Sequence, residues 1–180
     1  MALKATIYKA ELQIADMDRN YYETHLLTLA RHPSETDERM MIRLLAFAIN
    51  ASESLTFTKG LFDTEEPDLW QKDLTGAIEL WVEVGQPDEK RLMKACGRSQ
   101  NVIVYPYSAT SHIWYKQIAN KLERARNLTV INIPADASAQ LQALANRNMQ
   151  LQCTIQDGQI YLTDSVSTVL VEREDFKAER

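Results

Sequence analysis

The chain has 180 residues, of which 45% are hydrophobic and 25% charged, and its formal net charge is −5. This composition excludes general disorder. A chain of this length can bury roughly 70% of the surface that its unfolded form exposes, enough for a single domain over residues 1–180. No uncharged apolar run approaches the ~18 residues of a membrane span, and no signal peptide is visible, so we expect a cytoplasmic protein with no membrane partner. Cys96 and Cys153 form no CxxC pair, which suits a reducing compartment.

Apolar periodicity and turn residues predict a hairpin, a helix and three strands in the first half of the chain. Ser34 is the expected N-cap of the helix, whose apolar face carries Met41, Leu44 and Leu45. In chain order, the predicted elements are strand 8–14, turn 16–20, strand 21–29, a helix to about residue 50, and strands 55–58, 67–71 and 76–84.

In the second half, strands alternate with helices, and Asp157-Gly158 favours a type I′ hairpin turn. The predicted elements are helix 87–97, strand 102–105, helix 110–126, strand 128–133, a helix from 134, hairpin strands 151–156 and 159–162, and strand 166–171. We expect residues 172–180 to be a charged, frayed tail. This order favours an α/β (α+β) fold in which helices flank a mixed β-sheet, with additional hairpin strands at both ends of the chain.

Charge is distributed unevenly along the chain. Residues 87–126 carry eight basic and three acidic side chains, whereas residues 63–83 carry seven carboxylates and one lysine. An acidic stretch that holds a cation, next to a basic stretch that holds a polyanion, is what metal-assisted cleavage of nucleic acid needs. Two solvated faces that attract each other explain the same pattern.

Three carboxylates are candidate metal ligands. Asp68 and Glu83 are expected on adjacent strands, where their oxygens can converge, and Glu38 is expected on or beside the helix face that packs on the sheet. Mg²⁺ or Mn²⁺ takes such oxygen ligands together with water and phosphate. Each residue also has a structural interpretation. Glu38, in the first helical turn, interacts favourably with the helix dipole; Asp68 begins a turn; and Glu83 pairs with Lys94 or Arg98.

The order of these segments resembles the PD-(D/E)xK nuclease superfamily: Pro67-Asp68, the strand IELWVEV at 78–84 and the helix start PDEKRL at 87–92. More closely, nearly the whole chain is similar to the bacterial YaeQ family. That match is carried by ATIYKA at 5–10, ELWVEVGQP at 79–87 and KACGR at 94–98. The resemblance implies a restriction-endonuclease-like fold, with Asp68 as the PD aspartate and Glu83 as the (D/E) residue. Glu38 takes the place of the glutamate on the first core helix.

The lysine of the motif does not carry over, because Gly85 stands at its position. Lys90, in the first turn of the next helix, is the expected substitute, since its long side chain can reach the strand end. In this interpretation Asp68 and Glu83 bind Mg²⁺ or Mn²⁺, and Lys90 stabilises the developing charge. The expected substrate contacts are Gln86, Lys94, Arg98 and Lys116.

Two hypotheses therefore stand. The first is a metal-dependent nuclease that hydrolyses phosphodiester bonds of nucleic acid. The second is a catalytically degenerate module of the same fold, which contacts nucleic acid or a protein partner without cutting. Gly85 in place of lysine and the negative net charge favour the second hypothesis, whereas the three carboxylates and the basic segment favour the first.

Overall fold

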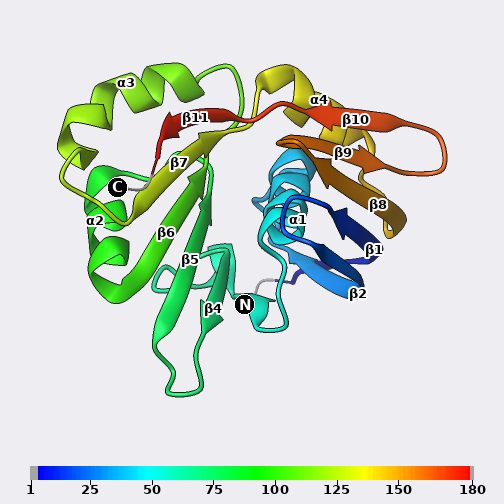
Figure 1. The fold of residues 1–180 in the computed structure, drawn as a ribbon, viewed down its shortest axis with the longest axis horizontal. Coiled ribbons are helices and arrows are strands. Elements are labelled where there is room, and N and C mark those ends of the chain that lie inside the picture. The colour runs from blue at the N-terminus through cyan, green and yellow to red at the C-terminus, as the bar shows by residue number, and fades with distance from the viewer. Residues whose placement is uncertain (1–3, 179–180) are drawn as a thin grey trace.

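The computed structural model describes residues 4–178, which form two β-sheets and four α-helices (Figure 1). The elements are β1 Thr6–Asp16, β2 Tyr21–Arg31, α1 Asp37–Asn50, β3 Leu55–Phe57, the 3₁₀-helix η1 Gly60–Phe62, β4 Leu69–Lys72, β5 Ile78–Val84, α2 Glu89–Arg98, β6 Ser99–Tyr105, α3 Ser111–Leu122, β7 Leu128–Asn132, α4 Ala135–Ala143, β8 Asn148–Gln156, β9 Gln159–Thr163, β10 Thr168–Val171 and β11 Glu174–Lys177.

The first sheet, sheet A, joins the two ends of the chain. Its strand order is β10-β9-β8-β1-β2, in which β1 and β8 are parallel and the other pairs antiparallel. Sequence periodicity predicts both hairpins, and Asp157 and Gly158 adopt the left-handed conformations that a type I′ turn needs. The pairing of β1 with β8 was not predicted. It makes the two hairpins a separate sheet instead of additions to a central one.

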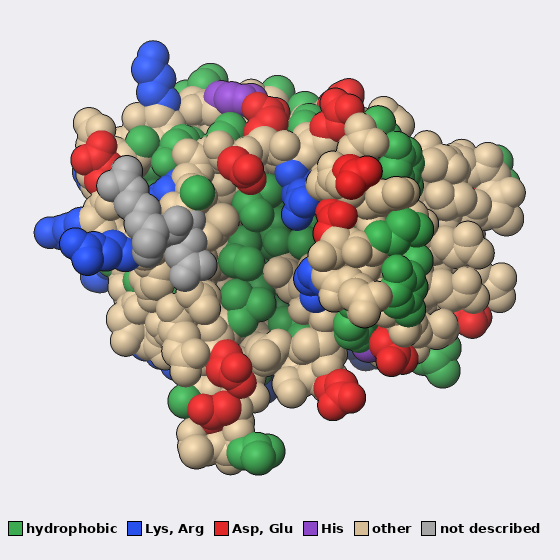
Figure 2. All heavy atoms as spheres, in the orientation of Figure 1, with side chains coloured by type: hydrophobic (Ala, Val, Ile, Leu, Met, Phe, Trp, Pro, Cys, Tyr) green, Lys and Arg blue, Asp and Glu red, His purple; other side chains and the backbone are tan. Residues whose placement is uncertain are grey.

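The second sheet, sheet B, has the order β11-β7-β6-β5-β4-β3, with a parallel centre formed by β5, β6 and β7. Helices α2 and α3 cover one face, where Trp81, Val102 and Leu128 belong to one buried cluster. The opposite face contributes Val82 and Tyr105 to the main core, which also contains α1 and the inner face of sheet A. On the face shown in Figure 2, hydrophobic side chains gather in a hollow between the two sheets.

Helix α1 lies between the sheets, so residues 40–49 are buried on every side and not only along one face. Its N-cap is Thr36, whose hydroxyl accepts from the backbone N–H of Arg39; the predicted cap at Ser34 is wrong. At the other end Arg19, from the β1–β2 turn, donates to the carbonyl oxygens of Ala51 and Ala48. A cation there complements the helix dipole, although it comes from a distant part of the sequence.

The C-terminal segment is not a frayed tail over residues 174–177. This stretch forms β11, which pairs with β7 at the edge of sheet B. Phe176 stacks on Tyr115 of α3 with ring centroids 5.1 Å apart, and Lys177 Nζ donates to the carbonyl oxygens of Ala125 and Leu128. The apolar ring and these carbonyl contacts hold a segment that its charged composition alone would leave in solvent.

Membrane-spanning helices are not found over residues 4–178: none of the helices there combines sufficient length with sufficient apolarity.

Candidate functional site

Asp68 and Glu83 come together because β4 and β5 are antiparallel neighbours. Leu69 lies opposite Val82, and the backbone N–H of Asp68 donates to the carbonyl of Val82 at 3.0 Å. Both carboxylates are buried, and both line a cavity of about 420 Å³ whose wall also includes Gly85 and Tyr107. The predicted convergence of these two residues on one cavity is therefore present.

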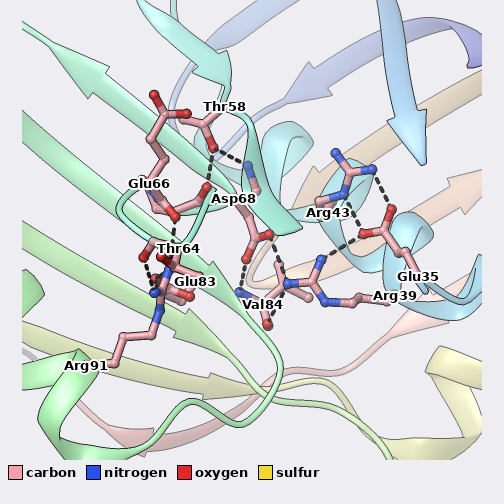
Figure 3. A network of polar contacts seen from close by, with 12 residues as sticks. Glu35, Arg39, Arg43, Thr58, Thr64, Glu66, Asp68, Glu83, Val84 and Arg91 are labelled. Carbon is pink, nitrogen blue, oxygen red and sulfur yellow. Dashed lines mark hydrogen bonds and ion pairs between the residues drawn. The ribbon is translucent and has the colours of Figure 1, made fainter. Parts of the chain in front are cut away.

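The Asp68 carboxylate is fully engaged within the protein (Figure 3). Oδ2 accepts from the backbone N–H of Val84 at 2.8 Å, and Oδ1 accepts from Arg39 Nη2 at 2.9 Å. The same guanidinium donates to Glu35 Oε2 at 2.7 Å and to the Val84 carbonyl. Burial lowers the pKa of Arg39, but the charges of Asp68 and Glu35 outweigh it and raise that pKa overall, so the guanidinium remains charged.

Glu35 connects a second arginine to this network. Arg43 donates to Glu35 through Nε at 2.8 Å and Nη2 at 2.7 Å, a bidentate pair in which both side chains are nearly inaccessible to solvent. Paired, planar contacts of this kind offset part of the cost of burying charge.

Glu83 has its own cation, Arg91, from the first turn of α2. Oε1 accepts from Arg91 Nε at 2.9 Å and from the indole Nε1 of Trp81 at 2.9 Å. Arg91 also donates to the carbonyls of Thr64 and Glu66, which ties the loop before β4 to the helix. Burial raises the pKa of Glu83, and the charge of Asp68 raises it further, against the opposing effect of Arg91.

The residues present do not fit a bound divalent cation in this arrangement. Three buried carboxylates (Glu35, Asp68 and Glu83) face three guanidinium groups (Arg39, Arg43 and Arg91). A metal ion would need at least one carboxylate to exchange an arginine for it. Over residues 4–178, no group of three or more His, Cys, Asp or Glu side chains is arranged to hold a metal.

The third expected ligand, Glu38, lies apart from this cavity. Its Oε2 accepts from the Ser138 hydroxyl of α4 at 3.2 Å, and it is not among the residues that line the cavity. Its spacing predicts a position on or beside the face of α1 that packs on the sheet, but the carboxylate instead contacts α4.

The lysine expected at the strand end is also elsewhere. Gly85 has a φ of 106°, a left-handed conformation that favours glycine over lysine. Lys90 is exposed and lines a second cavity, of about 280 Å³, together with Lys94, Arg98 and Trp81. The structure therefore places the predicted catalytic lysine with the predicted substrate contacts and not with the carboxylates.

The two remaining candidates lie on different surfaces. Gln86 lines the first cavity and donates to Thr110 Oγ1 at 2.9 Å, so it bridges the strand end to the start of α3. Lys116 is exposed on α3 and lines neither cavity.

Sequence reasoning missed the arginines that define this site. Lys94 and Arg98 were the expected partners of Glu83, but both contact Glu65 instead. The ion pair with Glu83 is formed by Arg91. The sequence does contain a signal for the contact between Arg91 and Glu83. Arg91 is three residues after the N-cap Asp88, in the helix turn nearest to the end of the strand that carries Glu83. Glu35 and Arg39 are spaced i, i+4, but the cap at Thr36, which separates Glu35 from the helix proper, was not foreseen.

The family model for the YaeQ protein matches residues 1–173. The chain belongs to the YaeQ family. Its relatives include YaeQ proteins described as uncharacterized from Salmonella typhi and Escherichia coli K12. They are 47% identical over 173 and 172 residues, which is 96% and 95% of both chains in each pair.

Two solved YaeQ structures share this fold. The crystal structure of the YaeQ protein from Xanthomonas axonopodis pv. citri superposes with a TM-score of 0.94 at 47% identity, covering 97% of this chain and 99% of that one. The protein from Pseudomonas syringae superposes with a TM-score of 0.93 at 35% identity, covering 97% of each chain. Membership of the YaeQ family thus fixes the α+β architecture of two mixed sheets and four helices, and the function must be argued from the site.

Proposed function

We propose that this protein is a degenerate relative of the PD-(D/E)xK nucleases that binds the phosphate backbone of nucleic acid without cleaving it. The observation that carries the proposal is the row of cations on α2. Lys90, Lys94 and Arg98 follow each other at four-residue spacing and line one cavity of about 280 Å³. Residues at this spacing share a helix face and rise about 6 Å per step, close to the separation of successive phosphates.

The surroundings of the row favour a flexible, single-stranded ligand. Trp81 lines the same cavity but is only 3% exposed, and the Arg98 guanidinium lies 5.1 Å from its ring centroid, so this ring holds a cation of the row and does not itself stack on a base. Trp70 contacts Trp81 edge-on and carries Lys72 Nζ 3.8 Å from its own centroid. Half-buried Trp70 is therefore the ring that a base could contact, and cations beside such a ring are typical of surfaces that bind single strands.

Glu65 is the opposing group in this cavity. It accepts from Lys94 Nζ at 3.0 Å and lies 3.9 Å from Arg98 Nη1, and all three side chains are solvent-accessible. Exposed pairs of this kind are worth about 0–1 kcal/mol, so phosphates can displace the Glu65 carboxylate.

The absence of cleavage follows from the neutralised carboxylates. Arg39 and Arg91 occupy the positions around Asp68 and Glu83 from which a metal would be held, and Lys90 faces the other cavity. Hydrolysis is the second candidate function, supported by the shared cavity of Asp68 and Glu83. It requires at least one of the two carboxylates to exchange its arginine for a metal ion.

The proposal is tested by fluorescence anisotropy with labelled single-stranded DNA and RNA across a salt series. Wild type should bind with a salt slope that falls by about 2 in the K90S/K94S/R98S variant, since each lost phosphate contact removes about 0.7 for a single strand. The control is K4S/K9S/R124S, which removes three exposed cations elsewhere. It should retain the slope. No wild-type binding at low salt, or an equal loss in the control, would refute the α2 interface.

A further inference from the structure

Strand β2 forms one edge of sheet A, at the lower right in Figure 1. It is eleven residues long, pairs with β1 along its whole length without a register shift, and contains neither proline nor lysine. Long regular edge strands template pairing with another strand, and proteins usually protect them with charge, proline, bulges or a covering element. This edge therefore needs an explanation.

The backbone groups that point outward can be assigned from one contact. Arg43 Nη2 donates to the carbonyl of Ala30 at 3.3 Å, so Ala30 directs its backbone groups away from β1. Because orientation alternates along an antiparallel strand, Tyr22, Thr24, Leu26 and Thr28 also point outward. In the described part of the chain, β1 is the only element that makes hydrogen bonds to the backbone of residues 22–28, so their outward-pointing groups face no other strand.

The N-terminal half of β2 is open on its solvent face and only partly covered on its inner face, where His25 packs on Phe47 of α1 with ring centroids 5.0 Å apart. The inner face of its C-terminal half is closed. Tyr22 is 55% exposed and Leu26 is 84% exposed, and Glu23 and Thr24 are exposed between them. Leu27 and Leu29 are buried, and Arg43 covers the edge at Ala30. Any added strand must therefore pair with the segment around Thr24.

We propose that a second copy of this chain adds to β2, antiparallel, about a two-fold axis at Thr24. This register places Tyr22 opposite Leu26 of the partner subunit, so each copy covers the other's two large exposed apolar side chains. It also places Glu23 opposite His25 of the partner subunit, so a carboxylate acceptor faces an imidazole that can donate a hydrogen bond to it. An isologous interface of this kind closes on itself and joins two five-stranded sheets into one.

A neighbouring register is less suitable. A two-fold axis at Leu26 would place Tyr22 opposite Ala30 of the partner subunit, where the edge is already used by Arg43. The spacing of the two exposed side chains and the open stretch of backbone therefore point to the same axis.

Sedimentation equilibrium across a concentration series tests the assembly. Wild type should show a monomer–dimer equilibrium, and L26K should raise its dissociation constant at least tenfold. At a concentration low enough for both proteins to be monomeric, L26K should leave Tm unchanged, because Leu26 is nearly fully exposed. V166K is the matched control: Val166 is 88% exposed in the β9–β10 loop, and its substitution should leave the equilibrium unchanged. A wild-type monomer at all concentrations, or a dimer insensitive to L26K, overturns the proposal.

Cross-linking tests the register. Residues on the two-fold axis face each other at about 5.5 Å between Cα atoms, within disulfide range. In a Cys96→Ser background, T24C should form a disulfide-linked dimer under mild oxidation, and L26C should not. Efficient cross-linking of L26C without T24C would contradict the Thr24 axis. Neither experiment involves nucleic acid, so its outcome is independent of the proposed function.

Discussion

Arg39 of α1 and Asp68, the residue immediately before β4, form a buried ion pair, with Nη2 and Oδ1 2.9 Å apart. The pair joins the helix that fills the space between the two sheets to the strand pair that carries both candidate catalytic carboxylates. Under the proposed function, this pair would have to open before Asp68 Oδ1 could bind a cation.

Arg39→Met should destabilise the protein by about 3–5 kcal/mol, because it leaves the buried Asp68 carboxylate without a cation. Urea unfolding measures this loss. In a double-mutant cycle with Asp68→Asn, the two effects should couple by about 0.5–3 kcal/mol. Arg124→Met, at an exposed position, should stay within about 0.5 kcal/mol of wild type. Additive effects of the Arg39 and Asp68 substitutions would show that the pair contributes nothing.

Glu83 should make the protein less stable as pH rises. Its folded-state pKa lies above the ordinary 4.5 because of burial and the Asp68 charge. From pH 4.5 to the folded-state value, the folded protein binds more protons than the unfolded chain, so the free energy of unfolding falls. Chemical unfolding should show the stability of wild type relative to Glu83→Gln decreasing through this window. The opposite slope would mean that the Arg91 pair outweighs the burial cost.

Phe176 should contribute to the free energy of unfolding although it lies in a charged C-terminal segment. Phe176→Ala removes its stacking on Tyr115 and should cost about 2 kcal/mol, roughly half of the 3–5 kcal/mol for a fully buried phenylalanine. Thermal unfolding measures the loss. Asp175→Ala, at the exposed neighbouring position of β11, is the control. An unchanged Tm for Phe176→Ala would restore the frayed-tail interpretation.

The two cysteines should differ in reactivity. Burial raises the pKa of the Cys153 thiol to about 12, and Cys153 is almost fully inaccessible. Cys96 is half-buried, with a pKa raised less strongly for the same reason. With a thiol reagent at pH 8, Cys96 should be modified slowly in the native state, and Cys153 only after unfolding. Equal native-state rates would contradict this placement.

Local periodicity predicted most of the elements but not how they assemble. The alternation in β1 and β5 and the Asp157-Gly158 turn depend on neighbouring residues, and those predictions are confirmed. The parallel pairing of β1 with β8 joins residues about 140 positions apart, such as Leu12 and Leu151. Nothing in either strand specifies that partner, so one sheet was expected where there are two.

The sequence predicted only part of the candidate site, because only some of its contacts join residues or strands that are close together in the chain. Asp68 and Glu83 converge because their strands are adjacent in sequence and in space. Glu38 does not join them, because α4 returns from a distant part of the chain to face it. The neutralising role of Arg39 depends on tertiary contacts with both Glu35 and Asp68, and only the first of these is local.

Thermal unfolding in a titration of Mn²⁺ or Mg²⁺ tests the central claim most directly, because any ion that binds the folded state raises Tm. Because Arg39 and Arg91 are paired with Asp68 and Glu83, we predict that the metal ions shift the Tm of neither wild type nor Asp68→Asn. A metal-dependent rise in Tm that Asp68→Asn abolishes, accompanied by cleavage of a labelled strand, would show that the arginines yield to a cation and that the protein hydrolyses what it binds.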